Sequence, residues 1–210
     1  PVMRTKQSFI VVAFLLFTTS VAAHVPDQPS VHDVVAEVQE RLIATFPFEG
    51  LNDLSVDEIT ALLTDEERDI LGAALISFEV NTPVIVYVLH DAKFRDSSPF
   101  EPFWLGLRGF EETDTEVRRG SDRFIAWKKQ FDPGRIGLGV NSLSGSNQQY
   151  FLALEATASD TALEVTNLYP AYLRTTTFEV GAQPYPHPAW GPLTSVPDAL
   201  KGLTLVQVDP

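Results

Sequence analysis

The sequence SFEVNTPVIVYVL, residues 77–89, has the pattern of two β-strands that follow one another closely. The first half, beginning at Ile76, alternates apolar and polar side chains, as a strand with one buried face does. The second half is rich in β-branched residues, and Pro83 stands at its first position, where a strand tolerates proline. The stretch therefore predicts strands at 75–80 and 83–89.

Further strand-like segments follow, and Gly, Pro, Ser and Asn clusters separate most of them. Short strands at intervals of about 8–12 residues are typical of an antiparallel sandwich. Helical patterns precede the strands instead of alternating with them, which disfavours a parallel doubly wound sheet. We predict a mainly β fold, an immunoglobulin- or fibronectin III-like antiparallel β-sandwich over residues 75–180, preceded by two or three short helices. The further strands are expected at 103–107, 113–119, 122–131, 135–141, 148–155, 161–166 and 172–180.

Residues 24–74 are predicted to form a helical N-terminal extension. Ser30 precedes apolar residues at helical spacing, which predicts a helix over 31–45. Ser55 and Thr64 each stand three residues before a glutamate and predict two more helix starts. Acidic residues in a first turn stabilise a helix by about 0.3–1 kcal/mol each, which gives this acidic cluster a structural role. The alternative, a calcium site, lacks the spaced ligands of an EF-hand loop. The cluster comprises Asp57, Glu58, Asp65, Glu66 and Glu67.

Residues 1–23 have the three parts of a secretory signal peptide. Arg4 and Lys6 supply the positive start, residues 9–17 are continuously apolar, and small side chains follow at 18–23. The apolar run is too short to span a bilayer core of about 30 Å. We expect an exported protein, periplasmic or extracellular, with a short buried helix or an uncleaved anchor as the alternatives for this segment.

The composition excludes several classes of function. The 210 residues carry 15 basic and 28 acidic side chains, a formal net charge of −13. This charge argues against a nucleic-acid partner and against binding to anionic lipid after signal cleavage. Because the chain contains no cysteine, disulfides, thiolate zinc sites and cysteine nucleophiles are excluded.

The C-terminal residues 181–210 are predicted to be a proline-rich connector followed by the start of a further domain or by an edge strand. Proline lacks the backbone donor that a central strand needs, and five prolines stand between 184 and 197. The apolar alternation at 203–208 is strand-like. We expect the chain to be a fragment of a longer protein.

No catalytic or metal-binding residue is predicted. The sequence has no H-E-x-x-H and no G-x-S-x-G motif. His90 and Asp91 end a predicted strand, where both side chains are expected to meet solvent. Residues 137–139, Gly-Leu-Gly, are too short for a dinucleotide loop. Residues 134–139 are expected to mark a turn and a close approach of backbones. The four histidines stand far apart, at His24, His32, His90 and His187.

Aromatic residues near two prolines form the candidate binding surface, which comprises Phe94, Phe100, Phe103 and Trp104. Exposed rings on a sandwich could stack on sugar faces. Tyr169 and Tyr172, which flank Pro170, are of the same kind. The alternative interpretation is that Trp104 and Trp127 fill the core between the sheets.

Several segments resemble a known protein family. These are residues 77–89 with PFWL at 102–105, WKKQFDPGRIGLG at 127–139, and the closing segment 193–207. Together they resemble the β-sandwich module that precedes the catalytic domain of exported calcineurin-like metallophosphoesterases, the group that includes purple acid phosphatases. The quoted residues are packing and turn patterns.

The resemblance implies a non-catalytic accessory module. The family's chemistry uses two metal ions held in D-x-H, G-D-x-x, G-N-H-[DE] and G-H-x-H blocks, and this sequence contains none of these blocks. We therefore expect no cofactor in this chain and a dinuclear metal centre in a downstream catalytic domain, its partner in cis. The alternative is a stand-alone exported binding module that recognises a glycan or a protein through surface aromatics.

Overall fold

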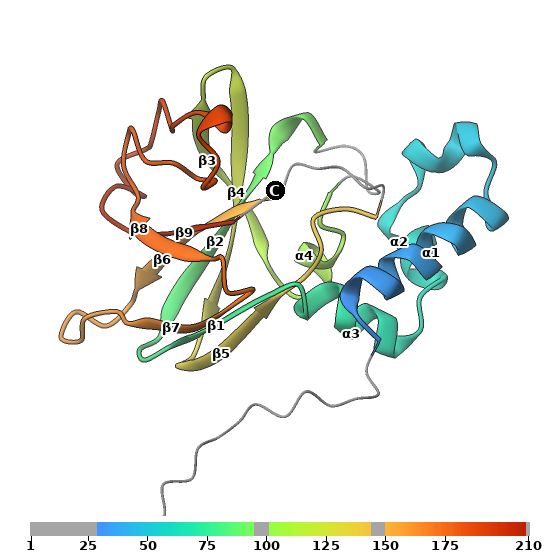
Figure 1. Cartoon of the computed structure of the whole chain (residues 1–210), viewed down its shortest axis with the longest axis horizontal. Helices are drawn as coiled ribbons and strands as arrows, with labels where there is room; N and C mark the ends of the chain where they lie inside the picture. The colour runs from blue at the N-terminus through green and yellow to red at the C-terminus, as the bar shows by residue number, and fades with distance from the viewer. Residues whose placement is uncertain (1–28, 95–100, 144–149, 209–210) are drawn as a thin grey trace, which may run out of the picture.

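The computed structural model of the chain describes residues 29–94, 101–143 and 150–208 (Figure 1). The predicted signal peptide, residues 1–23, lies outside the described residues. The helices are α1 Val31–Thr45, η1 Phe48–Asp53, α2 Val56–Ala61, α3 Asp65–Ala73, η2 Ala92–Phe94, α4 Trp104–Leu107 and η3 Pro188–Trp190. The strands are β1 Ile76–Val80, β2 Val84–Asp91, β3 Glu111–Arg119, β4 Asp122–Phe131, β5 Gly134–Leu138, β6 Phe151–Ala156, β7 Val165–Tyr169, β8 Arg174–Thr177 and β9 Thr204–Gln207.

The strands form two antiparallel sheets, and the predicted mainly β, sandwich-like architecture is confirmed. One sheet has the order β5-β1-β7 and the other the order β3-β4-β2-β6-β9-β8. The more specific immunoglobulin or fibronectin III topology stays a prediction.

Strand β2 lies inside the six-stranded sheet, between β4 and β6. Val84, Val86 and Val88 are fully buried in the larger core, which β1 and the helices share, whereas Leu89 faces a second core on the opposite side of the sheet. A strand buried on both faces needs a nearly continuous apolar sequence. This double burial explains the β-branched run in the sequence.

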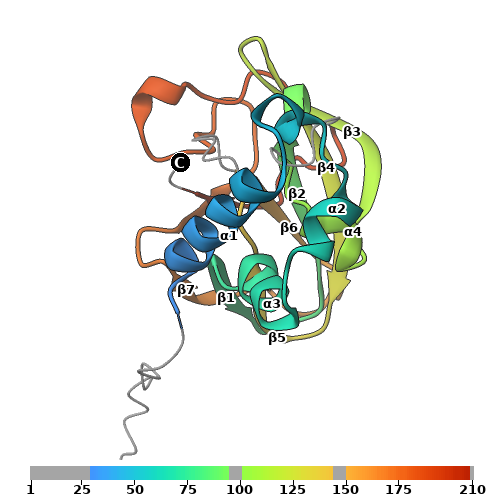
Figure 2. The ribbon, with the colours of Figure 1, turned by 90° about the vertical axis from the view of Figure 1, so that its right-hand side faces the viewer.

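Helices α1 to α3 pack beside the two sheets (Figure 2). The apolar stripe of α1, Val34, Val38 and Leu42, belongs to the same core as β1 and β2. The described part of the predicted extension is therefore joined to the sandwich by a shared core. Among the described residues, the model contains no helix with the length and hydropathy needed to cross a membrane.

The predicted helix starts are confirmed by their capping bonds. The Ser30 hydroxyl accepts a hydrogen bond from the Asp33 amide. Ser55 and Thr64 each form a reciprocal capping box with the glutamate three residues later. The hydrogen bonds from Ser55 also lower the pKa of Glu58. The glutamates of these two boxes thus have the structural role expected for the acidic cluster.

The predicted close approach of backbones at the glycines is confirmed at Gly137 of β5 and at Gly139, directly after the strand. A Cβ at Gly139 would lie 2.2 Å from the carbonyl oxygen of Leu71, and one at Gly137 would lie 2.3 Å from that of Ala73. The Val140 amide donates to the Leu71 carbonyl over 2.7 Å. Only a residue without a side chain allows α3 to lie this close to the strand.

The strand predicted at 103–107 is wrong, because residues 104–107 form the short helix α4. The Arg108 amide donates to the Trp104 carbonyl, and the Phe110 amide to the Leu105 carbonyl. Three consecutive side chains, Phe103 to Leu105, are buried. A strand with one buried face would bury only alternate residues, so core packing favours a helical turn here.

Residues 178–203, here called the strap, contain the predicted proline-rich connector, and they pack against the sandwich. The strap crosses the second face of the six-stranded sheet (red in Figure 1). Its prolines keep the backbone out of the ladder, while the apolar side chains between them cover the sheet. The strap residues buried in this second core are Phe178, Tyr185, Leu193, Val196 and Leu200.

The prediction that residues 203–208 start a further domain or form an edge strand is also wrong. Strand β9 pairs with β6 on one side and with β8 on the other, so it lies inside the six-stranded sheet. Leu205 and Val206 are fully buried, one in each core. Burial on both faces of the sheet fixes this late strand in the sandwich.

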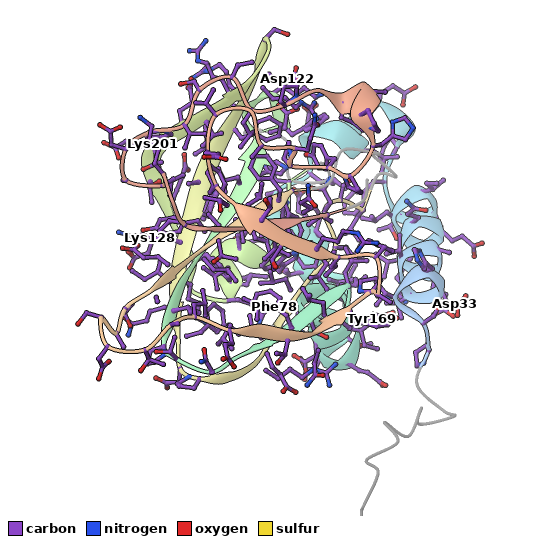
Figure 3. All side chains as sticks on the ribbon, turned by 60° about the vertical axis from the view of Figure 1, so that its left-hand side comes forward. Asp33, Phe78, Asp122, Lys128, Tyr169 and Lys201 are labelled. Carbon is purple, nitrogen blue, oxygen red and sulfur yellow. The ribbon has the colours of Figure 1, made fainter. Side chains whose placement is uncertain are left out.

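Most apolar side chains lie between the layers and most charged side chains lie on the outside (Figure 3). Phe78 is fully buried between the layers, whereas Asp33 and Lys128 are exposed on the outside. Tyr169 is 57% exposed beside Pro170.

Substitution of Gly139 by alanine is expected to destabilise the fold by at least about 2 kcal/mol, because the new Cβ would overlap helix backbone. Urea unfolding followed by circular dichroism measures the change. Gly106→Ala is the matched control, because nothing lies within 4 Å of its Cβ position. Equal unfolding midpoints for Gly139→Ala and the wild type would contradict the close approach.

Arg41 on α1 pairs with Glu67 on α3 at 2.6 Å. This pair, together with the capping hydrogen bonds of Thr64, lowers the pKa of Glu67 from 4.5 to about 2. Because the folded pKa is the lower one, this stabilisation is complete above pH 4.5 and is lost as the pH falls towards 2. Glu67→Gln keeps a capping side chain but cannot titrate. We expect its free energy of unfolding to fall less than that of the wild type on acidification, by on the order of 2 kcal/mol.

Urea titrations at several pH values measure this difference, and Glu66→Gln, an exposed change in the same turn, is the control. The same loss of stability on acidification in Glu67→Gln and in the wild type would show that the ion pair does not contribute.

Candidate functional site

The predicted aromatic binding surface is not on the surface where the structure describes it. Phe103 and Trp104 are only 4% and 1% exposed, so their assignment to a binding surface is wrong. Phe94 is half-buried, with its ring 6.3 Å from that of His90, and Phe100 lies outside the described residues. The alternative interpretation is confirmed for Trp104, and Trp127 packs against the same core while partly exposed.

Trp104 anchors α4 in the core. Its Nε1 donates to the Val140 carbonyl over 2.7 Å, and its ring meets Phe110 and Tyr150 edge to face. The Tyr150 hydroxyl donates to the Gly139 carbonyl over 2.7 Å, and burial raises the pKa of this tyrosine. Both aromatic donors therefore satisfy carbonyl groups beside the close approach of α3 and β5.

A groove of about 440 Å³ lies between α3 and α4, next to this anchor. Arg108 lines it, and Nη1 of Arg108 donates to the carbonyls of Gly72 and Gly137 over 2.5 and 2.7 Å. Burial lowers the pKa of Arg108, and the nearby Asp69 carboxylate opposes that effect. The side chain thus joins helix to strand.

The charges along this groove are balanced. Arg68 pairs with Asp65 across one helical turn at 2.9 Å, and Asp69 stands near Arg108. Leu107 at the groove is 54% exposed. The groove is lined by two guanidinium groups and two carboxylates, those of Arg68, Arg108, Asp65 and Asp69.

The described histidines lie in unlike places. His32 is exposed on α1 and His187 is exposed in the strap, while His24 lies outside the described residues. In the described ranges, no group of three or more His, Asp or Glu side chains could hold a metal ion. The described residues therefore do not offer the set of ligands that a dinuclear metal centre needs.

The expectation that His90 and Asp91 meet solvent is wrong, because each is only 4% exposed. Strand β4 pairs with β2 up to the last residue, Asp91 opposite Phe124, so the strand end does not fray. The Asp91 carboxylate accepts from the Lys93 amide over 3.0 Å and pairs with the Lys93 ammonium at 3.1 Å. This carboxylate fixes the turn that follows β2.

Sequence reasoning missed a buried cation, Arg119, at the end of β3. Its side chain is 5% exposed, and it pairs with Asp122 at 2.6 Å. Its Cζ lies 5.4, 5.0 and 5.2 Å from the ring centroids of Phe124, Tyr185 and Trp190. A signal was present, because Arg119 stands two residues after the buried Val117, on the same face of a strand.

Burial also raises the pKa of Tyr185, and the positive charge of Arg119 opposes that effect. The phenol thus stays protonated over the physiological range, which suits a ring that packs against a cation. The guanidinium of Arg119 thus packs against this ring and has a structural role.

Comparison with protein families, with curated proteins and with solved structures finds no match to this chain. The resemblance to the metallophosphoesterase module therefore rests on the sequence segments quoted above.

Trp104→Phe is expected to lower the free energy of unfolding by about 1–3 kcal/mol, because the buried Val140 carbonyl loses its donor. Trp127→Phe, a partly exposed tryptophan of β4, is the matched control and should cost less. Urea unfolding measures both. If Trp104→Phe unfolds at the wild-type urea concentration, the indole does not anchor α4.

Proposed function

We propose that this chain is an exported, non-catalytic β-sandwich module that supports a metallophosphoesterase domain in the same protein. The observation that carries the proposal is the use of two cations, the partly buried Arg108 and the buried Arg119. Arg108 holds two backbone carbonyls and Arg119 packs among three rings. These groups hold one layer to the next, which is the chemistry of a support and not of a reaction centre.

The layered architecture suits this role. The six-stranded sheet has a core on each face, one shared with the helices and one under the strap. A sheet fixed on both faces resists bending because interiors are close-packed. We propose an immunoglobulin- or fibronectin III-like relationship for this sandwich, in keeping with the resemblance of residues 77–89 and 127–139.

We assign the catalysis, the metal ions and the cellular location as follows. Phosphoester hydrolysis and the two metal ions belong to the downstream domain, the partner in cis, and this chain supplies no metal ligand. Export follows from residues 1–23, with a periplasmic or extracellular destination. The negative net charge, −13, is consistent with a module that binds neither nucleic acid nor anionic membrane.

The full chain, exported from a host and purified, is expected to fold yet to hydrolyse no aryl phosphate above the buffer rate. The assay is run with added Mn²⁺, Zn²⁺ or Fe³⁺, and circular dichroism verifies the fold. Turnover that a chelator abolishes would overturn the non-catalytic assignment.

The partner is tested separately by reading the coding sequence beyond Pro210. We expect an open frame that encodes G-N-H-[DE] and G-H-x-H blocks. A stop codon directly after Pro210 would refute a catalytic domain in cis, whatever the phosphatase assay gives.

A further inference from the structure

The strap forms a closed loop whose two ends meet. The Phe178 amide donates to the Leu203 carbonyl over 2.8 Å, and the Gly202 amide donates to the Phe178 carbonyl over 2.9 Å. Gly181 and Gly202, one near each end, have φ values of +94° and +81°. Glycine adopts this region without strain, so the strap joins the sheet at two points where the chain reverses easily.

The far side of the strap rests on the sheet edge at β3. The Arg118 amide donates to the Ser195 carbonyl over 3.0 Å, and the Thr194 amide donates to the Arg118 carbonyl over 2.7 Å. The Gly120 amide donates to the Thr194 hydroxyl over 3.1 Å. These contacts place the strap directly beside Arg119.

Arg119 links the sheet to the strap. Its guanidinium packs against Phe124 of the sheet and against Tyr185 and Trp190 of the strap, at 5.0–5.4 Å. Its Nη1 is buried without a hydrogen-bond partner in the described part of the chain. An unpaired buried donor destabilises the closed position of the strap. The ring contacts and the ion pair with Asp122 stabilise that position.

The surface under the strap is separate from the main core. Leu89, Phe124 and Phe151 face the strap, while the helices and the three-stranded sheet pack on the opposite side of the same six-stranded sheet. Lifting the strap would expose one sheet face and would leave the other core intact.

We propose that the strap is a lid that Arg119 locks, and that it opens as one unit while the rest of the fold stays closed. Opening breaks the contacts with Arg118 and Arg119 and the hydrogen bonds that Gln207 and Val208 donate to the carbonyls of Gln183 and Pro184. It exposes the apolar face of β2, β4 and β6 together with the strap side chains that cover it. Opening of such a unit below the free energy of global unfolding is the kind of event that native-state hydrogen exchange detects. This inference does not depend on the proposed enzymatic partner.

Native-state hydrogen exchange of the full chain, followed by NMR, tests the lid. In the wild type, the amides of Thr194 and Ser195, which donate from the strap to the Arg118 carbonyl of β3, should exchange together and faster than those of β2. In Arg119→Met these strap amides should exchange at least about tenfold faster, with β2 unchanged. The dye ANS, which binds exposed apolar surface, should bind more strongly to this variant.

Arg123→Met is the matched control. Arg123 lies on the same hairpin, but its side chain is exposed and pairs with Glu116 away from the strap. It should leave strap exchange unchanged. If Arg119→Met fails to fold, Trp190→Leu removes a half-buried ring of the lock and should give the same selective acceleration. Strap amides that exchange at the β2 rate in the wild type, a variant that accelerates both regions equally, or one that accelerates neither would overturn the lid.

Discussion

The closeness of α3 to β5 is the constraint on which the rest of the structure depends. Gly137 and Gly139 let helix backbone touch strand backbone, with Cβ positions only 2.2–2.3 Å from carbonyl oxygens. Trp104 then reaches the Val140 carbonyl and Arg108 bridges the carbonyls of Gly72 and Gly137. Because α1 packs on α3 and both sheets share its core, this contact sets the position of the whole helical layer.

A partly buried guanidinium, Arg108, and a buried one, Arg119, illustrate different ways to place a cation in a fold. Arg108 satisfies backbone carbonyls beside the helical layer, where a neutral side chain would leave acceptors unmet. Arg119 instead meets aromatic rings, which attract a cation through their quadrupole but leave one donor unpaired. The first arrangement satisfies backbone acceptors, while the second leaves a buried donor unpaired where the strap meets the sheet.

This use of charge shapes the functional interpretation. Charged residues elsewhere in the described chain cap helices, as Glu58 and Glu67 do, or fix a turn, as Asp91 does. Each of these carboxylates accepts a backbone hydrogen bond at the element that it caps or turns. A sandwich built in this way offers stiffness and a separable strap, two properties that suit a supporting module next to a domain that carries the reaction.

The amino-acid pattern alone determined the helix over 31–45, the caps at Ser55 and Thr64, the strand 122–131 and the antiparallel class, because capping and alternation are local properties. It also indicated the close approach at Gly139, since glycine in a strand has few other uses. Tertiary structure decided the helical turn at 104–107, the burial of the aromatic residues expected to bind, and the place of the strap. These depend on which distant surface a segment meets. Alternation with Val117 indicates the strand face on which Arg119 lies, but the residues beside Arg119 and Trp104 do not identify the surface that covers them.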